Sequence, residues 1–255
     1  MVVLFLLIVA RVSGALIFNP VFGRQNYPAM ARGALILVFS VICYDYCFLA
    51  GVRVEESPEF LMFMIMVLKE LFAGFILGFG MQLAFFAVQF GTTIIDYMLG
   101  LSMAQVYDPS SGTQMSVSQG LYQAYMILIF FAADCHISFL RILYRTMAKI
   151  PLGSPSFPTD LVNVVLVYFS DSLLLGLQFA VPVIVVELLV EVGLGILMRI
   201  SPQMNVFTVN FQVKLIVGLA LLVFLFNPMA DKISEIWSSM FDVLYNMISL
   251  MGSGT

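Results

Sequence analysis

The chain has 255 residues, of which 62% are hydrophobic and 10% are charged, and its mean hydropathy is +1.05. Its formal net charge of −4 gives no case for nucleic-acid binding, which needs a basic patch. The apolar runs are continuous rather than alternating, which favours membrane helices and excludes a membrane β-barrel. The composition therefore indicates an α-helical membrane protein.

Cysteine and histidine are too few and too scattered to indicate a cofactor or metal. Cys43, Cys47 and Cys135 form an odd set, which predicts no disulfide framework, and their spacing matches no known zinc site. His136 is the only histidine, and packing or capping is favoured for it over a role as proton carrier. No nucleophile or metalloprotease motif is present in the sequence, so we expect no enzyme, no cofactor and no metal.

The first apolar run, residues 2–18, carries Arg11 near its middle. An arginine in the centre of a bilayer costs about 2.5–3.5 kcal/mol, so Arg11 either faces protein or water, or reaches an interface. The run is not typical of a signal peptide, because no basic segment precedes it. Arg24 and Arg32 follow it, whereas the loop after residues 33–50 is acidic on balance, which predicts a cytoplasmic first loop.

Residues 60–95 are apolar over more than the roughly 20 residues that cross a bilayer. The adjacent opposite charges of Lys69 and Glu70 are predicted to lie on different helix faces. Gly74 and Gly78 form a small-xxx-small pattern, which favours close helix packing, although the same glycines would also permit a bend. The pattern predicts one long, tightly packed helix or a broken pair.

A polar, turn-forming segment at residues 96–119 separates this run from the next apolar run, residues 120–133. It contains Asp108-Pro109 and a Ser-Ser-Gly sequence, which break helices. At membrane depth such a segment is tolerated only where protein or water satisfies its backbone. It is either a surface connection or a segment held inside a pore.

Residues 134–149 are predicted to form an amphipathic helix with Arg141, Arg145 and Lys149 on its polar side. If each apolar run spans once, this basic helix lies outside and the central polar segment lies inside, which contradicts the positive-inside rule twice. Either the runs do not each span once, or partner subunits surround these helices.

Residues 161–198 form another long apolar block, in which Glu187 and Glu191 share one helix face. Carboxylates within a membrane segment indicate an ion or proton site or contact with a basic group, with Arg199 as an internal candidate. The alternative is that both are solvated at an interface. A polar break at residues 199–210 follows, then the apolar run 211–227.

The C-terminal residues 233–250 have a weaker, amphipathic pattern, with Trp237 and Asp242 among them. A helix of this kind is able to lie along a membrane surface.

Four stretches together resemble the flagellar biosynthetic protein FliR family and its counterpart in virulence secretion. They are RVSGALIFNPVFG (11–23), the segment 96–119, His136 with the basic helix and Pro151-Leu152-Gly153, and ELLVEVGLGILMRISPQMNVF (187–207). The last is the most specific, because it carries the pattern Arg-x2-Pro-Gln-x-Asn-x-Phe. Its motif and turn residues are Glu187, Glu191, Arg199, Pro202, Gln203, Asn205 and Phe207. Thr146 departs from the serine expected in the third stretch.

The resemblance implies an all-α membrane-associated protein of packed helical hairpins, one subunit of a helical export-gate ring. It implies a FliP-like region (1–160), a FliQ-like hairpin (161–230) and an amphipathic tail (231–255). The implied partners are FliP and FliQ in the ring, FlhB, FlhA, and the unfolded flagellar subunits that cross the bacterial inner membrane at the flagellar basal body.

We interpret residues 101–119 as a plug that fills the channel of such a gate when it is idle. Flexible polar residues would occupy the channel, and unbranched methionine adapts to varied surfaces. The predicted plug residues are Leu101, Met103, Tyr107, Asp108, Pro109, Ser110, Gly112 and Met115. The alternatives are an injectisome subunit of the same family and, from another class, a secondary transporter with broken helices and buried carboxylates.

Overall fold

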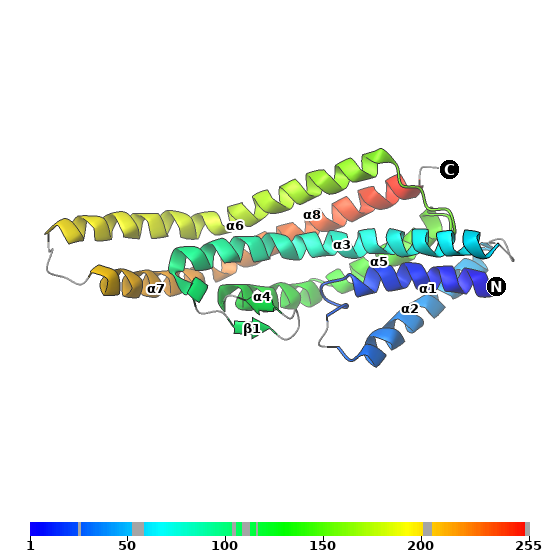
Figure 1. Ribbon diagram of the computed structural model, residues 1–255, viewed down its shortest axis with the longest axis horizontal. Helices are drawn as coiled ribbons and strands as arrows, with labels where there is room; N and C mark the ends of the chain where they lie inside the picture. Colours follow the sequence, from blue (N-terminus) through cyan, green and yellow to red (C-terminus); the bar gives the residue numbers. More distant parts are fainter. Residues whose placement is uncertain are drawn as a thin grey trace. The chain divides into compact units, whose positions relative to one another are not determined.

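The computed structural model describes residues 1–24, 27–52, 59–103, 106–108, 113–115, 117–200 and 206–252 (Figure 1). Of residues 103, 106–108, 113–115 and 206–208 only the backbone is described. The chain divides into two compact units. Unit 1 consists of Met1–Ala84, Phe130–Phe169 and Trp237–Thr255, and unit 2 consists of Phe85–Ile129 and Ser170–Ile236.

The predicted all-α class is confirmed, with a short two-stranded hairpin in addition. The helices are α1 (Val2–Ile17), α2 (Ala29–Leu49), α3 (Phe60–Leu99), α4 (Val117–Ala132), α5 (Cys135–Lys149), α6 (Thr159–Ile200), α7 (Val206–Phe224) and α8 (Phe226–Gly252). Within the described ranges, α2, α3 and α6 are long and apolar enough to cross a membrane. The number rises to five if each of two bent helix pairs counts as one span. The protein is thus a helical membrane protein.

The two longest apolar runs each form one continuous helix. α3 has 40 residues and α6 has 42, so of the two alternatives for residues 60–95, one long helix or a broken pair, the structure has the long helix. Pro182 lies inside α6 without ending it. By contrast α1, with 16 residues, falls short of the length of a span, and much of its surface is buried by the protein.

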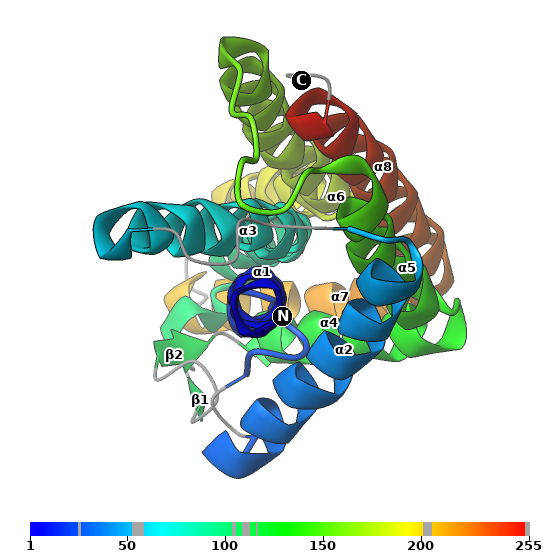
Figure 2. The ribbon, with the colours of Figure 1, turned by 90° about the vertical axis from the view of Figure 1, so that its right-hand side faces the viewer.

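Glycines bring the backbones of α1 and α3 together in unit 1. A Cβ atom on Gly14 would overlap the carbonyl oxygen of Leu71, and one on Gly74 would overlap the carbonyl oxygen of Arg11. Figure 2, which looks along α1, shows α3 on one side of it and α2 on another. The small-xxx-small pattern at Gly74 and Gly78 therefore serves close packing, as the sequence predicts.

In unit 2, glycines likewise bring the backbones of α3 and α6 together. A Cβ atom on Gly91 would overlap the carbonyl oxygen of Gly176, and a Cβ atom on Gly176 would overlap that of Ala87. The ring of Tyr122 on α4 meets the ring of Phe179 on α6 edge-on, with centroids 5.1 Å apart. These contacts pack α3 and α4 against α6 in unit 2.

Two sharp bends interrupt the remaining helices. Between α4 and α5 the axis turns by 69° at Asp134, whose φ of 53° is left-handed. Between α7 and α8 it turns by 61°. Pro228 lies in the first turn of α8. Proline is tolerated there, since the first turn needs no amide donor.

The amphipathic character predicted for residues 134–149 and 233–250 is confirmed. α5 exposes Arg141, Arg145 and Lys149 and buries its apolar side. α8 likewise buries a row of apolar side chains, Ile233, Ile236, Trp237, Met240, Leu244, Met247, Ile248 and Met251. The protein itself thus covers the apolar face of this C-terminal stretch, and its position relative to a membrane surface stays a prediction.

Candidate functional site: the central segment and the buried polar groups

The central segment begins where α3 ends at Leu99. Gly100 adopts a φ of +73°, a left-handed conformation that closes a helix at low cost for glycine. A 3-10 turn, Leu101–Met103, follows, and then β1 (Val106–Asp108) pairs antiparallel with β2 (Thr113–Met115) before α4 begins. The polar segment thus folds back on itself between two apolar helices.

The predicted plug residues are distributed over this turn and hairpin. Leu101 is half-buried and Met103 closes the 3-10 turn. In the ladder Tyr107 faces Gln114, Asp108 faces Thr113, and Met115 faces Val106. Pro109, Ser110 and Gly112 lie outside the described residues.

Polar side chains are buried in the helix ends that flank the segment. Asp96, in the last turn of α3, is 1% exposed, and Ser118 and Tyr122, one turn apart on α4, are 1% and 0% exposed. Among the described residues, none of these three side chains has a hydrogen-bond partner for its polar atoms. An unpaired buried polar group costs about 1–3 kcal/mol, so this region holds groups that need a further partner, such as water or another chain.

The two glutamates of α6 have different environments. Glu187 is 1% exposed, and neither of its carboxylate oxygens has a partner among the described residues. Glu191, one turn later, is half exposed and accepts a hydrogen bond from Lys214 Nζ of α7. Arg199, the internal candidate, lies exposed at the end of α6, and Lys214 is the partner of Glu191 instead. The alternative that both glutamates are solvated is wrong for Glu187.

The remaining motif residues lie around the connection of α6 to α7. Pro202, Gln203 and Asn205 fall outside the part of the chain that the structure describes. Phe207 lies in the first turn of α7.

A second polar cluster, in unit 1, is fully hydrogen-bonded. Arg11 Nε and Nη2 donate to the carboxylate of Glu70 at 2.5 and 3.0 Å, and both side chains are completely buried. Arg11 Nη1 donates to the carbonyl oxygens of Thr146 and Ile150, at the end of α5, at 2.8 and 3.2 Å. The amide of Gly153 donates to Glu70 Oε1 at 2.7 Å. Arg11 thus faces protein, and the alternative of reaching an interface is wrong.

Sequence reasoning did not identify Glu70 as the partner of Arg11. A signal was present, because Glu70 lies one turn before Gly74 and Arg11 lies three residues before Gly14. Each charge therefore precedes a glycine at helical spacing, and the two glycines mark where α1 and α3 approach. Opposite charges beside two close-packing glycines predict a buried ion pair.

The cysteines and His136 behave as packing residues. Cys43, Cys47 and Cys135 are buried free thiols. The ring of His136 lies 5.3 Å from the ring of Phe131, between centroids. Among the described residues, no group of three or more histidine, cysteine or acidic side chains is placed to hold a metal ion.

Fold and sites together define an α-helical membrane protein that buries polar groups between closely packed apolar helices. The sequence profile described as "Bacterial export proteins, family 1" matches residues 2–240, and the chain belongs to this family.

Its relatives include flagellar biosynthetic proteins and a Yop proteins translocation protein. It is 26% identical to the flagellar biosynthetic protein FliR of Bacillus subtilis, over 97% of this chain and 95% of that protein. It is also 26% identical to FliR of Escherichia coli (94% and 90%) and to the Yop proteins translocation protein T of Yersinia pestis (96% and 94%). The chain is accordingly a membrane component of a type III export apparatus. It is a structural component and not an enzyme.

Proposed function

We propose that this chain is a core subunit of the flagellar type III export gate. With FliP and FliQ it forms the channel through which unfolded flagellar subunits cross the bacterial inner membrane, next to FlhB and FlhA at the basal body. Similarity to FliR over nearly the whole length of the chain supports this assignment.

The central segment supports a role as the plug of that channel. A short strand hairpin, which includes Asp108, Thr113 and Gln114, lies between the apolar helices α3 and α4, and buried polar side chains without described partners lie in the helix ends that flank it. Such groups are stable at membrane depth only next to water or to other polar groups. A segment that occupies a water-filled channel and is displaced by a passing chain meets both conditions.

The outer surfaces of the helices support assembly with other helical subunits. α6 exposes large apolar side chains along its length, among them Val162, Leu166, Val181, Val185, Leu189 and Val192. We assign α6 and α7, joined by Glu191 and Lys214, to the FliQ-like hairpin and residues 1–160 to the FliP-like region. Neighbouring FliP and FliQ subunits then cover part of the apolar surface, which also explains why the loops do not follow the positive-inside rule.

Deletion of residues 108–114 tests the plug. We expect the assembled complex to form and the ion conductance of the idle membrane to rise, because the channel loses the material that fills it. The measurement is conductance in planar bilayers, or ion leakage in cells, with assembly checked by co-purification. A control variant replaces the same residues by a Gly/Ser sequence of equal length, which keeps the filling and should stay closed. Unchanged conductance in the deletion variant contradicts the plug.

The injectisome is the second candidate, because the similarity to the Yersinia translocation protein T is as extensive as the similarity to FliR. Native mass measurement of the complex from its own cells, with the co-purified proteins identified, separates the two systems. Flagellar partners support the proposal, and virulence-secretion partners support the alternative. A chain that is isolated alone or as a simple dimer would instead favour a secondary transporter.

A further inference from the structure

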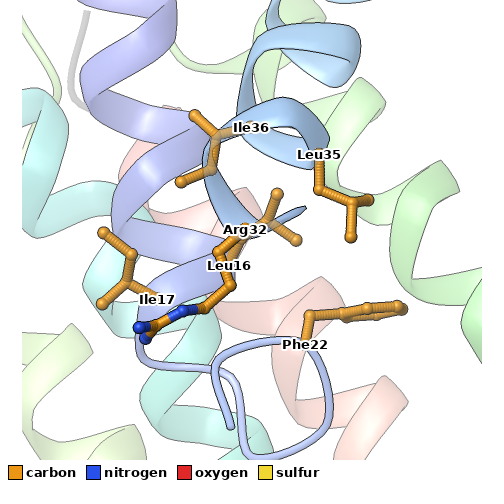
Figure 3. A pocket seen from close by; sticks show the side chains of 6 residues that line it. All are labelled: Leu16, Ile17, Phe22, Arg32, Leu35 and Ile36. Atoms are coloured by element: carbon orange, nitrogen blue, oxygen red, sulfur yellow. The ribbon is translucent and has the colours of Figure 1, made fainter. Parts of the chain in front are cut away.

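A small apolar pocket opens in unit 1 between the end of α1 and the start of α2. Leu16 and Ile17 of α1, Phe22 of the turn, and Leu35 and Ile36 of α2 line it (Figure 3). The sixth lining residue is Arg32, whose side chain extends across the pocket toward Ile17 in the same view. A single guanidinium thus lies among five apolar side chains.

Arg32 is an arginine without a described counter-charge. Its Nε is buried and has no hydrogen-bond partner among the described residues. The other arginine of this turn, Arg24, donates its Nε to the carbonyl oxygen of Pro20 at 3.2 Å, so it is engaged within the chain. A partly buried guanidinium that lacks an internal acceptor is suited to bind an external anion, and it pairs best with phosphate or carboxylate.

The position of Arg32 in α2 sets its depth in the membrane. α2 is one of the candidate spans, and only 17% of its most apolar window is buried by the protein. Its exposed side is mostly apolar, with Met30, Leu37, Val41, Phe48 and Leu49 on the surface, and its exposed acid, Asp45, lies near the other end of the helix from Arg32. Arg32 lies in the first turn after Pro28, at the level where a helix of 21 residues meets the lipid headgroups.

We infer that this pocket binds one anionic phospholipid, with its phosphate on the Arg32 guanidinium and the start of an acyl chain against Leu35 and Ile36. The positive charge of Arg32 favours an anionic headgroup. The apolar lining of the pocket favours a lipid over a free anion. The exposed apolar side of α2 continues the path of the acyl chain beyond the pocket. This lipid would fix the end of α1 against the start of α2 whichever export system contains the chain.

The test is lipid retention by the full chain, purified in detergent with its associated subunits. Phosphatidylglycerol and phosphatidylcholine are added separately, and bound lipid is counted by native mass spectrometry. We expect phosphatidylglycerol to be retained in preference to phosphatidylcholine. We also expect Arg32→Gln to weaken that retention about ten- to hundredfold, since it removes a charge-assisted hydrogen bond. Arg141→Gln, at an exposed arginine of α5, is the matched control and should retain the lipid.

A second variant keeps the test decisive if Arg32→Gln fails to assemble. Ile36→Trp fills the pocket while the guanidinium remains, and it should also lower retention. Equal retention of both lipids by the unaltered protein, or full retention by Arg32→Gln, overturns the inference. Inorganic phosphate that displaces the lipid completely at millimolar concentration overturns it as well, because the site would then be one for a free anion. If Ile36→Trp changes the subunit content and not the lipid, a neighbouring protein covers this face, and that result also overturns the inference.

Discussion

Unit 1 and unit 2 both bury charged or polar side chains among apolar helices, yet they treat them differently. In unit 1, Arg11 and Glu70 bind each other and also bind the backbone at the end of α5 and at Gly153. In unit 2, Asp96 and Glu187 are just as deeply buried but lack partners among the described residues. The buried ion pair of unit 1 is completed within the chain, whereas these two acids of unit 2 have no described partner.

We interpret the ion pair of unit 1 as part of a rigid scaffold, and the region around the central segment of unit 2 as the part that adapts during export. A buried ion pair whose donors and acceptors are all satisfied ties its helices to one arrangement, since any displacement leaves a charge unpaired. Arg11 also donates to the carbonyl oxygens of Thr146 and Ile150 at the end of α5, and the Thr146 oxygen accepts the amide of Ile150 as well. Unpaired groups beside the central segment are instead available to water, to neighbouring subunits or to a displaced loop. We therefore expect rigidity in unit 1 and adaptability around the central segment of unit 2.

The largest expected effect is that of Glu70→Gln. The change keeps the shape of the side chain but leaves the Arg11 guanidinium buried without a counter-charge, which costs about 3–5 kcal/mol. We expect a large fall in the thermal unfolding temperature in detergent and a low amount of protein in the membrane. The double variant Arg11→Met with Glu70→Leu removes both charges and should recover much of the loss. If Glu70→Gln unfolds at the temperature of the unaltered protein, the ion pair does not hold unit 1 together.

The next largest effect is expected at the close approach of α1 and α3. Gly74→Ala places a methyl group against the Arg11 carbonyl oxygen, and separating the two backbones costs about 1–3 kcal/mol. Gly195→Ala in α6 is the matched control, because no heavy atom lies within 4 Å of the position of its Cβ. The control should be neutral or slightly stabilising, as alanine favours helix more than glycine. Equal unfolding temperatures for the two variants would contradict close packing at Gly74.

Local sequence patterns predicted much of this fold. Length and continuous apolarity predicted α3 and α6, and the glycine spacing predicted the packing of α3. The neighbouring charges Lys69 and Glu70 do lie on different faces, the first exposed and the second buried. The partners of the charges were not predictable in this way. Arg11 and Glu70 are 59 residues apart, so their pairing depends on how α1 and α3 dock.

The structure of the central segment and the partner in the second ion pair were likewise not predictable from local sequence patterns. A polar, turn-rich stretch predicted a loop, whereas residues 106–108 and 113–115 pair as strands, which needs a register that composition does not carry. Arg199 is nearer to Glu191 along the chain than Lys214 is. Lys214 is the partner because α7 packs against α6, and this packing cannot be deduced from sequence spacing.

Glu187→Gln is the direct counterpart of Glu70→Gln and should have a much smaller effect on stability. The Glu187 carboxylate has no described partner, so neutralising it removes no hydrogen bond to a described group and lowers the desolvation penalty of the buried group. We expect the unfolding temperature of the purified complex to stay the same or to rise slightly. A fall as large as that of Glu70→Gln would mean that Glu187 pairs with a cation in the assembled protein, and unit 2 would then be no less complete than unit 1.

The smallest effect is expected at the ion pair of Glu191 and Lys214. Its side chains are 48% and 15% exposed, so this chain does not enclose the pair, and an exposed pair that water screens contributes about 0–1 kcal/mol. Lys214→Gln should therefore barely change the unfolding temperature at low salt and should have no effect at high salt. Lys232→Gln, in the exposed pair with Glu235 on α8, is the matched control. A salt-resistant loss confined to Lys214→Gln would mean that neighbouring subunits cover this pair in the complex. In that case the connection of α6 to α7 is an assembly contact, and the unpaired polar groups of unit 2 have their missing partners in other chains.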